Sequence, residues 1–209
     1  MTRVALVDYG MGNRRSVEKA LEHVGAEVVR TADPGALDDA ERLVLPGVGA
    51  FPEAMRRLRA LGLADALRER AAAGIPLLGI CLGMQLLFEA SDEHEGAEGL
   101  GLLPGTVTRL DPGPAGKLPH IGWNRVAIER DGGPLGLRAG DARAYYHVHS
   151  FVCRPADPAL VVGRGEYGER FASIVARGTL AGVQFHPEKS SAAGLDLLAA
   201  FAGARAAVA

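Results

Sequence analysis

The sequence contains few of the features that mark secreted or membrane proteins. Only two of its 209 residues are cysteine, Cys81 and Cys153, far below the cysteine density of small disulfide-stabilised secreted domains. No apolar run approaches the roughly 18 residues of a membrane-spanning helix, and the N-terminus lacks a signal-peptide pattern. Asn-x-Ser/Thr glycosylation sites are also absent. These absences predict a cytoplasmic protein that contacts no membrane.

An excess of charge of one sign is also missing. The 23 basic and 25 acidic residues give a formal net charge of -2, so no nucleic acid is expected as a partner. The composition, 48% hydrophobic and 23% charged, is typical of a globular chain. The length lies within the usual range for one domain, and we therefore expect a single domain over residues 1–209.

Lysine and side-chain amides are scarce. Only three of the 23 basic residues are lysine. The side-chain amides are Asn13, Gln85, Asn124 and Gln184. We attribute this bias to codon usage, although adaptation to heat gives a similar pattern. Because so few of these residues are present, the positions that keep them are candidates for functional roles.

Apolar strands and helices alternate in the first half of the chain. Strands are expected at 3–8, 27–31, 42–45 and 76–80, and helices at 16–24, 51–61, 63–73 and 83–89. This alternation predicts an α/β fold with a mostly parallel central sheet flanked by helices, as in flavodoxin-like proteins.

The second half of the chain changes character. Between about 105 and 182, Gly/Pro turns separate short strands expected at 106–110, 124–128, 144–148, 160–166 and 173–177. We interpret this region as a β-rich insertion into the α/β fold. A strand at 180–185 and a helix at 192–207 are expected to close the structure.

Two patterns suggest a cofactor or a metal, and neither is complete. Gly10 and Gly12 follow the first strand as in a dinucleotide fingerprint, but Arg15 stands where the third glycine belongs. His147 and His149 alternate as two zinc ligands on a strand could, without a third ligand nearby or a Cys-x-x-Cys pair. We therefore expect no cofactor and no metal.

Cys81 lies in the sequence Gly79-Ile80-Cys81-Leu82-Gly83, at the expected junction of a strand and a helix. This is the pattern of a nucleophile elbow, with sulfur in place of oxygen. A helix that starts just after the thiol favours the thiolate through its dipole and free N–H groups. The alternative is a buried cysteine that only fills space, which is the commoner fate of a free cysteine.

A second motif, Val183-Gln184-Phe185-His186-Pro187-Glu188, supplies a partner for the thiol. Pro187 favours an extended backbone at His186, so the side chains of His186 and Glu188 are expected to project together. A carboxylate beside an imidazole fixes its tautomer and stabilises the imidazolium. Together with Cys81 these residues predict a Cys-His-Glu triad.

The oxyanion formed by such a nucleophile needs a second N–H donor. Pro46-Gly47-Val48-Gly49 follows an expected strand, and its glycines allow a backbone N–H to approach the thiol. With the N–H of Leu82, a donor from Val48 or Gly49 would complete an oxyanion hole. The alternative is an ordinary strand-to-helix turn, which is compatible with the same four residues.

The segments GICLGMQLL (79–87), PGVG (46–49) and FHPE (185–188) together resemble the class I, triad-type glutamine amidotransferases. The resemblance covers essentially the whole chain. DYGMGN (8–13), KLPHIGWN (117–124) and HPEKSS (186–191) are most similar to the glutaminase subunits of imidazole glycerol phosphate synthases.

The resemblance implies a fold, a reaction and a set of residues. Cys81 would attack the side-chain amide of L-glutamine and form a thioester with release of ammonia, while His186 moves protons and Glu188 orients it. The oxyanion would bind at Leu82 and at Val48 or Gly49. The substrate-binding positions correspond to Gly49, Gln85, Glu93, His149, Ser150 and Phe151.

The resemblance also implies a partner. Ammonia would pass to a cyclase subunit, a (β/α)₈ barrel that forms a heterodimer with this chain and makes imidazole glycerol phosphate for histidine biosynthesis. The candidates for the docking face are Asn13, Trp123, Asn124 and Lys189. Simple core packing is the alternative for Trp123, because tryptophan is usually well buried.

Two other functions stay open on the sequence alone. One is a stand-alone cysteine hydrolase that acts on γ-glutamyl substrates without a partner. The other is a non-catalytic docking subunit in which the triad has lost its activity.

Overall fold

A computed structural model describes residues 1–114 and 116–203, and within these residues thirteen strands form one mixed sheet. The strands of the first half are β1 (Arg3–Val7), β2 (Glu27–Thr31), β3 (Arg42–Gly47), β4 (Leu77–Cys81), β5 (Ala90–Ser91), β6 (Ala97–Glu98) and β7 (Gly105–Arg109). Those of the second half are β8 (His120–Ile128), β9 (Ala142–His149), β10 (Phe151–Pro155), β11 (Val161–Tyr167), β12 (Glu169–Arg177) and β13 (Leu180–Val183).

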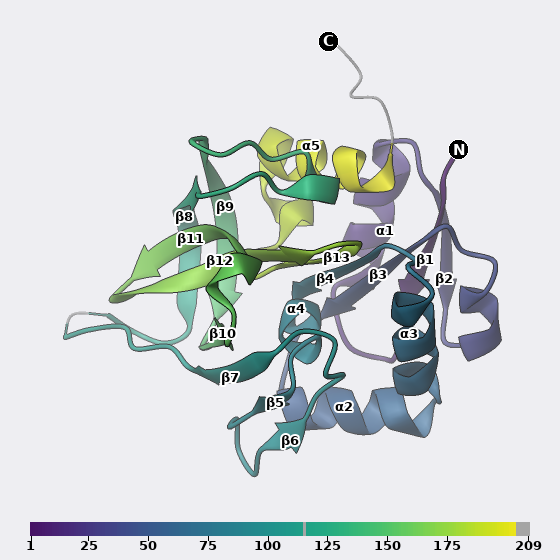
Figure 1. The fold of residues 1–209 in the computed structure, drawn as a ribbon, viewed down its shortest axis with the longest axis horizontal. Helices are drawn as coiled ribbons and strands as arrows, with labels where there is room; N and C mark the ends of the chain where they lie inside the picture. The colour runs from purple at the N-terminus through teal and green to yellow at the C-terminus, as the bar shows by residue number, and fades with distance from the viewer. Residues whose placement is uncertain (115, 204–209) are drawn as a thin grey trace.

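Helices cover both faces of the parallel part of the sheet. They are α1 (Arg14–His23), α2 (Phe51–Ala60), α3 (Leu63–Ala72), α4 (Leu82–Leu86) and α5 (Ser191–Ala202). In Figure 1, α5 and α1 lie on one side of the strands, and α2 and α3 lie on the other. Because both faces are buried, strands such as β4 are apolar along their whole length instead of alternating with polar residues.

Each face of the sheet has its own core. Val4 and Leu6 of β1 pack with the apolar residues of α1 and α5. Ala5 and Val7 of the same strand belong to the core beneath α2 and α3. Successive side chains of a strand point to opposite faces, so one short apolar run contributes to both cores.

The centre of the sheet is parallel, in the order β2-β1-β3-β4-β13. β4 therefore lies between β3 and β13, and Gly47 is paired with Cys81 at its carboxyl end. Parallel strands end at a common edge, where α/β proteins place their ligand sites. The residues that follow β3, β4 and β13 consequently meet at one edge of the sheet.

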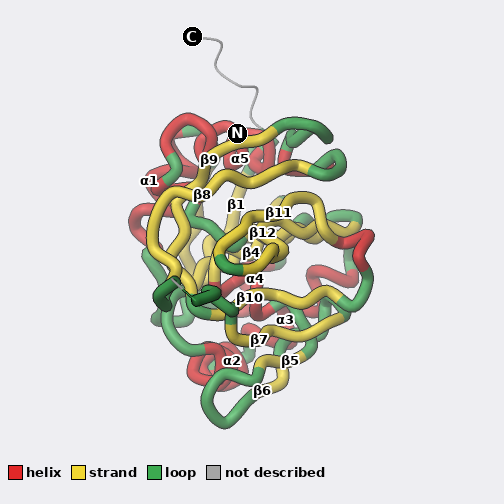
Figure 2. Tube along the Cα trace, turned by 90° about the vertical axis from the view of Figure 1, so that its left-hand side faces the viewer, coloured by secondary structure: helices red, strands yellow, loops and turns green. Residues whose placement is uncertain are grey.

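Beyond β13 the pairing becomes antiparallel through β12, and the β-rich region forms the other side of the molecule. Figure 2 looks onto this side and shows β8 and β9 as one hairpin beside β11 and β12. Within the described residues no helix combines the length and the apolar character that crossing a bilayer requires.

The α/β class and the β-rich region agree with the expectation, and several boundaries differ. The helix expected at 83–89 ends at Leu86, because the carbonyls of Leu86 and Leu87 accept hydrogen bonds from Leu100 and Leu102. β8 and β12 begin earlier than expected, since hairpin pairing extends them. β5, β6 and β10 were not predicted. The last helix was expected over 192–207; it ends at Ala202 before left-handed Gly203, and 204–207 lie outside the described residues.

Candidate active site

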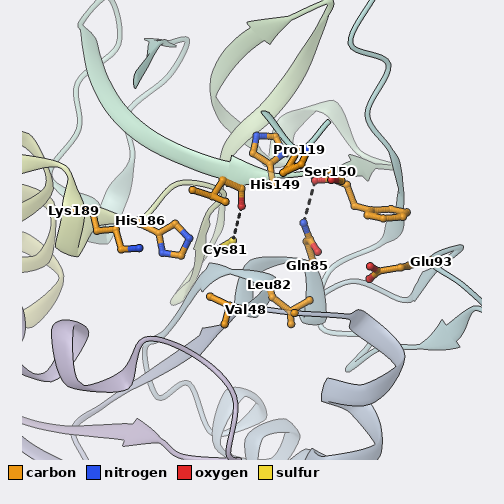
Figure 3. A pocket seen from close by; sticks show the side chains of 13 residues that line it. Val48, Cys81, Leu82, Gln85, Glu93, Pro119, His149, Ser150, His186 and Lys189 are labelled. Atoms are coloured by element: carbon orange, nitrogen blue, oxygen red, sulfur yellow. Dashed lines mark hydrogen bonds between the residues drawn. The ribbon is translucent and has the colours of Figure 1, made fainter. Parts of the chain in front are cut away.

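A cavity of about 390 Å³ opens at the carboxyl edge of the parallel strands. Its lining combines residues from several separate segments of the chain, and Figure 3 shows their side chains around Cys81. The lining residues are Val48, Gly49, Cys81, Leu82, Gln85, Glu93, Pro119, Val148, His149, Ser150, Phe151, His186 and Lys189. The structure thus brings together all the residues that the sequence predicted for oxyanion and substrate binding. Pro119 and Val148 were not predicted.

Cys81 has the strained backbone of a nucleophile elbow. Its φ is 55° and its ψ is -113°, outside the regions that a residue with a Cβ normally occupies. The turn is so tight that a Cβ on Gly83 would lie 1.8 Å from the carbonyl oxygen of Leu45. A Cβ on Gly79 would lie 2.5 Å from the carbonyl oxygen of Gly83. Only glycine fits at either position, and the elbow can therefore present the thiol at the cavity.

His186 and Glu188 lie together as expected. His186 Nδ1 is 2.9 Å from Glu188 Oε1, and both side chains are buried. His186 has the expected extended backbone, with φ -100° and ψ 97°, and residues 187–189 then form a short 3₁₀ turn. The turn is held against β9, where the N–H of His186 donates to the carbonyl of Tyr146 at 2.9 Å. Glu188 thereby fixes Nδ1 as the protonated nitrogen and leaves Nε2 for chemistry.

The electrostatics of this group favour a charged imidazole. Burial opposes the charge on His186, but the hydrogen bonds and charges of Cys81 and Glu188 outweigh burial and raise the pKa of His186 to about 10. At neutral pH the imidazolium therefore faces the sulfur. An imidazole in this position can exchange a proton with the thiol and with a substrate bound beside it.

The candidate oxyanion loop, residues 46–49, packs against the loop at 9–12. The hydroxyl of Tyr9 donates to the carbonyl of Pro46 at 2.8 Å, and Tyr9 is fully buried. A Cβ on Gly49 would lie 2.8 Å from Met11 Cε. Sequence reasoning missed Tyr9 and Met11, although both belong to the DYGMGN motif. Val48 and Gly49 of this loop line the same cavity as Leu82, the first residue of α4.

The polar residues at the far end of the cavity are held in place. Glu93 Oε2 accepts the N–H of Phe51 at 2.7 Å, at the start of α2. Gln85 Nε2 donates to the carbonyl of Phe151 at 3.1 Å. Figure 3 shows Gln85 between Cys81 and Glu93, so a small molecule that reaches the thiol also meets an amide and a carboxylate.

Comparison with known proteins identifies the family. The model of the family described as glutamine amidotransferase class-I matches residues 5–202. The chain belongs to the class I glutamine amidotransferases. The fold and family expected from the sequence are thus confirmed.

Individual relatives of this amidotransferase are similar over nearly their whole length. Proteins named imidazole glycerol phosphate synthase subunit HisH from Moorella thermoacetica and Aromatoleum aromaticum are 51% and 48% identical to it. The alignments cover 96% of this chain in both cases, and 94% and 98% of those proteins. The structure of PurLQS from Thermotoga maritima covers 97% of this chain and 98% of its own, with a TM-score of 0.78 and 23% identity, and supports the fold alone.

Behind the cavity the amidotransferase buries a histidine cluster, which consists of His120, His147 and His149. His149 Nδ1 is 3.0 Å from the carbonyl of Phe151 and must donate to it, so Nε2 accepts from His120 Nδ1 at 3.1 Å. His147 donates likewise to the carbonyl of Tyr145 and accepts from Ser173 Oγ at 2.9 Å. Burial lowers the pKa of all three histidines, which favours these neutral rings. Within the described residues no group of three or more His, Cys, Asp or Glu side chains is arranged to hold a metal.

The histidine cluster predicts a loss of stability in acid. Burial, with a smaller contribution from neighbouring histidines, lowers the pKa values of His147 and His149 to about 3. An unfolded histidine titrates near 6.5, so this stability is present above pH 6.5 and is lost as pH falls towards 3. When the pH falls from 7 to 5, each of these two histidines should lower the free energy of unfolding by about 2 kcal/mol. His186, whose pKa is raised, should increase the free energy of unfolding over the same pH range by less than about 1 kcal/mol.

Urea unfolding at the two pH values measures this loss. In a His147→Gln variant, which cannot take up the proton, about half of the pH difference should disappear. The matched control is His94→Gln, since His94 is exposed and its replacement should leave the difference unchanged. Equal pH differences in the wild type and in His147→Gln would contradict the prediction.

The residues predicted for docking are spread over two loops and a hairpin. Trp123 is 55% exposed, which excludes core packing, and its ring lies 6.2 Å edge-on from the ring of Tyr146. Lys189 Nζ lies 6.0 Å above the same tyrosine ring. Asn13 is half-buried just before α1. The amide of Asn124 is used within the chain, where it donates to the carbonyl of Glu166 at 2.9 Å.

Proposed function

We propose that this amidotransferase hydrolyses L-glutamine to glutamate and ammonia, and supplies the ammonia to the cyclase subunit of an imidazole glycerol phosphate synthase in histidine biosynthesis. The observation that carries the proposal is the meeting of Cys81, His186 and Glu188 at the carboxyl edge of the sheet, beside a cavity of about 390 Å³. The names of its relatives favour this synthase over other amidotransferase pathways.

The reaction follows from the geometry of the three residues. The Cys81 thiolate attacks the side-chain carbonyl carbon of glutamine, and the resulting oxyanion accepts hydrogen bonds from the N–H of Leu82 and from residue 48 or 49. Loss of one such donor typically reduces the rate by roughly 10²–10³. The His186 imidazolium gives its proton to the departing nitrogen, which leaves as ammonia, and a thioester remains.

Hydrolysis of the thioester completes the cycle. His186 is now neutral and takes a proton from water, whose oxygen attacks the same carbon through a second oxyanion. Collapse of that intermediate releases glutamate, breaks the C–S bond and restores the thiolate–imidazolium pair. Glu188 stays ionised and holds the imidazole tautomer throughout. Glu93, Gln85 and the segment 149–151 line the same cavity, which supports their proposed role in binding the amino-acid end of the substrate.

We further propose that the cyclase, a (β/α)₈ barrel, docks as a heterodimer on a patch formed by Ile121, Trp123, Tyr146 and Lys189. Ile121 and Trp123 are exposed large apolar side chains on one hairpin. Lys189 belongs both to this patch and to the lining of the cavity, so the patch reaches the site where ammonia is released. A partner seated there would receive ammonia without its loss to water. Partly exposed tryptophans of this kind are frequent interface hot spots.

Ammonia release from glutamine, measured with and without the cyclase and its ribonucleotide substrate, tests the proposal. We expect low activity of the chain alone and an increase of at least about tenfold in the complex. In Trp123→Ala the cyclase concentration that gives half of this increase should rise by at least about tenfold, the usual cost of a lost hot spot. Leu61→Ala is the matched control, because Leu61 is also an exposed apolar side chain but lies between α2 and α3.

The same assay separates the two alternatives. A stand-alone γ-glutamyl hydrolase would turn over at full rate without the cyclase, and the Trp123 variant would not differ from the wild type. A docking subunit without catalysis would release no ammonia in any combination.

A further inference from the structure

The catalytic sulfur has a second polar neighbour that the triad does not include. Gln184 Nε2 lies 3.8 Å from Cys81 Sγ, within hydrogen-bonding range for sulfur. Gln184 is fully buried and stands between the end of β13 and His186. A buried amide beside a reactive thiol has no evident packing role, because an apolar side chain would fill the same volume without the cost of desolvation.

The hydrogen bonds around Gln184 decide which end of its amide faces the sulfur. Its Oε1 accepts from Gln85 Nε2 at 3.1 Å. Gln85 Nε2 also donates to the backbone carbonyl of Phe151, which can only accept, so the Gln85 amide cannot be reversed. The Gln184 oxygen is therefore held towards Gln85, and its N–H₂ group points at Cys81. Two side chains and one backbone carbonyl fix this orientation.

The other contact of the sulfur favours the neutral thiol. Cys81 Sγ lies 3.7 Å from the carbonyl oxygen of Val148, which accepts the S–H proton. Once the proton is lost, that carbonyl dipole repels the sulfur, whereas an N–H donor attracts it. Hydrogen bonds to charged groups are roughly twice as strong as those between neutral groups. A donor beside Sγ therefore lowers the energy of the thiolate more than that of the thiol.

We propose that Gln184 is a further catalytic residue, which donates its side-chain N–H to the Cys81 thiolate and stabilises it alongside His186. Gln85 is its positioning residue, because it holds the Gln184 amide in the donating orientation. This inference rests on the proposed function, in which Cys81 is the nucleophile. Gln85 and Gln184, the two glutamines of the chain, thus form a hydrogen-bonded pair next to the Cys81 thiol.

The pH dependence of Cys81 alkylation by iodoacetamide, followed on the Cys81 peptide by mass spectrometry, tests this role without any substrate. In Gln184→Met, which has a similar length and no N–H, the midpoint of alkylation should rise by about one pH unit, a tenfold smaller thiolate population at a fixed low pH. In Gln184→Glu the carboxylate should raise the midpoint further. Gln85→Met keeps the Gln184 amide but removes the hydrogen bond that orients it. This variant should give a smaller shift of the midpoint in the same direction.

Ser173→Ala is the matched control. The carbonyl of Ser173 accepts the backbone N–H of Gln184 at 2.9 Å, so this variant alters the same buried neighbourhood and leaves the amide donor in place. Its midpoint should equal that of the wild type. An unchanged midpoint in both Gln184→Met and Gln85→Met, or an equal shift in Ser173→Ala, would overturn the inference. Failure of the wild-type Cys81 peptide to be labelled would overturn the proposed nucleophile instead.

Discussion

Replacement of Cys81 by alanine will reduce ammonia release from glutamine by at least about 10⁴-fold. Removing the nucleophile of a triad leaves only binding and the oxyanion hole, and losses of this size or larger are typical. Alanine keeps the Cβ, so the strained backbone at φ 55° is not made worse and the fold should persist. The measurement is ammonia release by the complex with the cyclase, where the wild-type rate is highest.

Cys153→Ala provides the control, because the chain has only these two cysteines. Cys153 lies buried on β10, and burial raises the pKa of its thiol well above the ordinary value, so it should not react. The variant should keep its rate within about threefold of the wild type, an effect of the size expected for a modest change in packing. An electrophilic glutamine analogue should label Cys81 and leave Cys153 free. Full activity of Cys81→Ala, or labelling of Cys153, would refute the assignment.

The second large effect is expected for Gly83→Ala, a change of one methyl group outside the triad. The added Cβ would lie 1.8 Å from the carbonyl oxygen of Leu45, a backbone atom in the centre of the sheet. Either β3 or the elbow has to move. We expect a loss of about 3 kcal/mol or more in the free energy of unfolding, at the upper end of overpacking effects. Activity should fall by at least about 100-fold, since a shift of 1 Å misplaces the thiol and the N–H of Leu82.

Gly35→Ala is the corresponding control. A Cβ there would meet no atom closer than 3.5 Å, and the residue is not left-handed, so stability should stay within about 0.5 kcal/mol of the wild type. Urea unfolding and the glutaminase assay measure both effects. Wild-type stability and activity in Gly83→Ala would mean that the tight elbow is not required.

The parts of the fold that followed from the sequence are those with a local cause. The apolar run of β4 must be buried on both faces, and the glycines at 79 and 83 mark the tight turn around Cys81. The pairing of His186 with Glu188 also follows from a short segment, since Pro187 restricts the backbone between them.

The parts that could not be predicted depend on contacts between distant segments. Helix α4 ends early because residues 100–103 hydrogen-bond to its last carbonyls, and no feature of residues 83–89 encodes that contact. The partner of Tyr9 is a backbone carbonyl 37 residues away. Gln184 stood out by its rarity, but only the hydrogen bonds of the two amides in the folded structure show which atom faces the sulfur.

The place of β13 in the sheet has a consequence for synthesis of the protein. β13 pairs with β4 at the centre of the sheet but is made late, and Gln184 follows Cys81 by 103 residues. At translation rates of about 5–20 residues per second this separation lasts about 5–20 s. Throughout that interval β4 has an unpaired edge and Cys81 lacks both His186 and Gln184. A nascent or truncated chain can therefore aggregate through the unpaired edge of β4. It cannot hydrolyse glutamine, because the triad is incomplete.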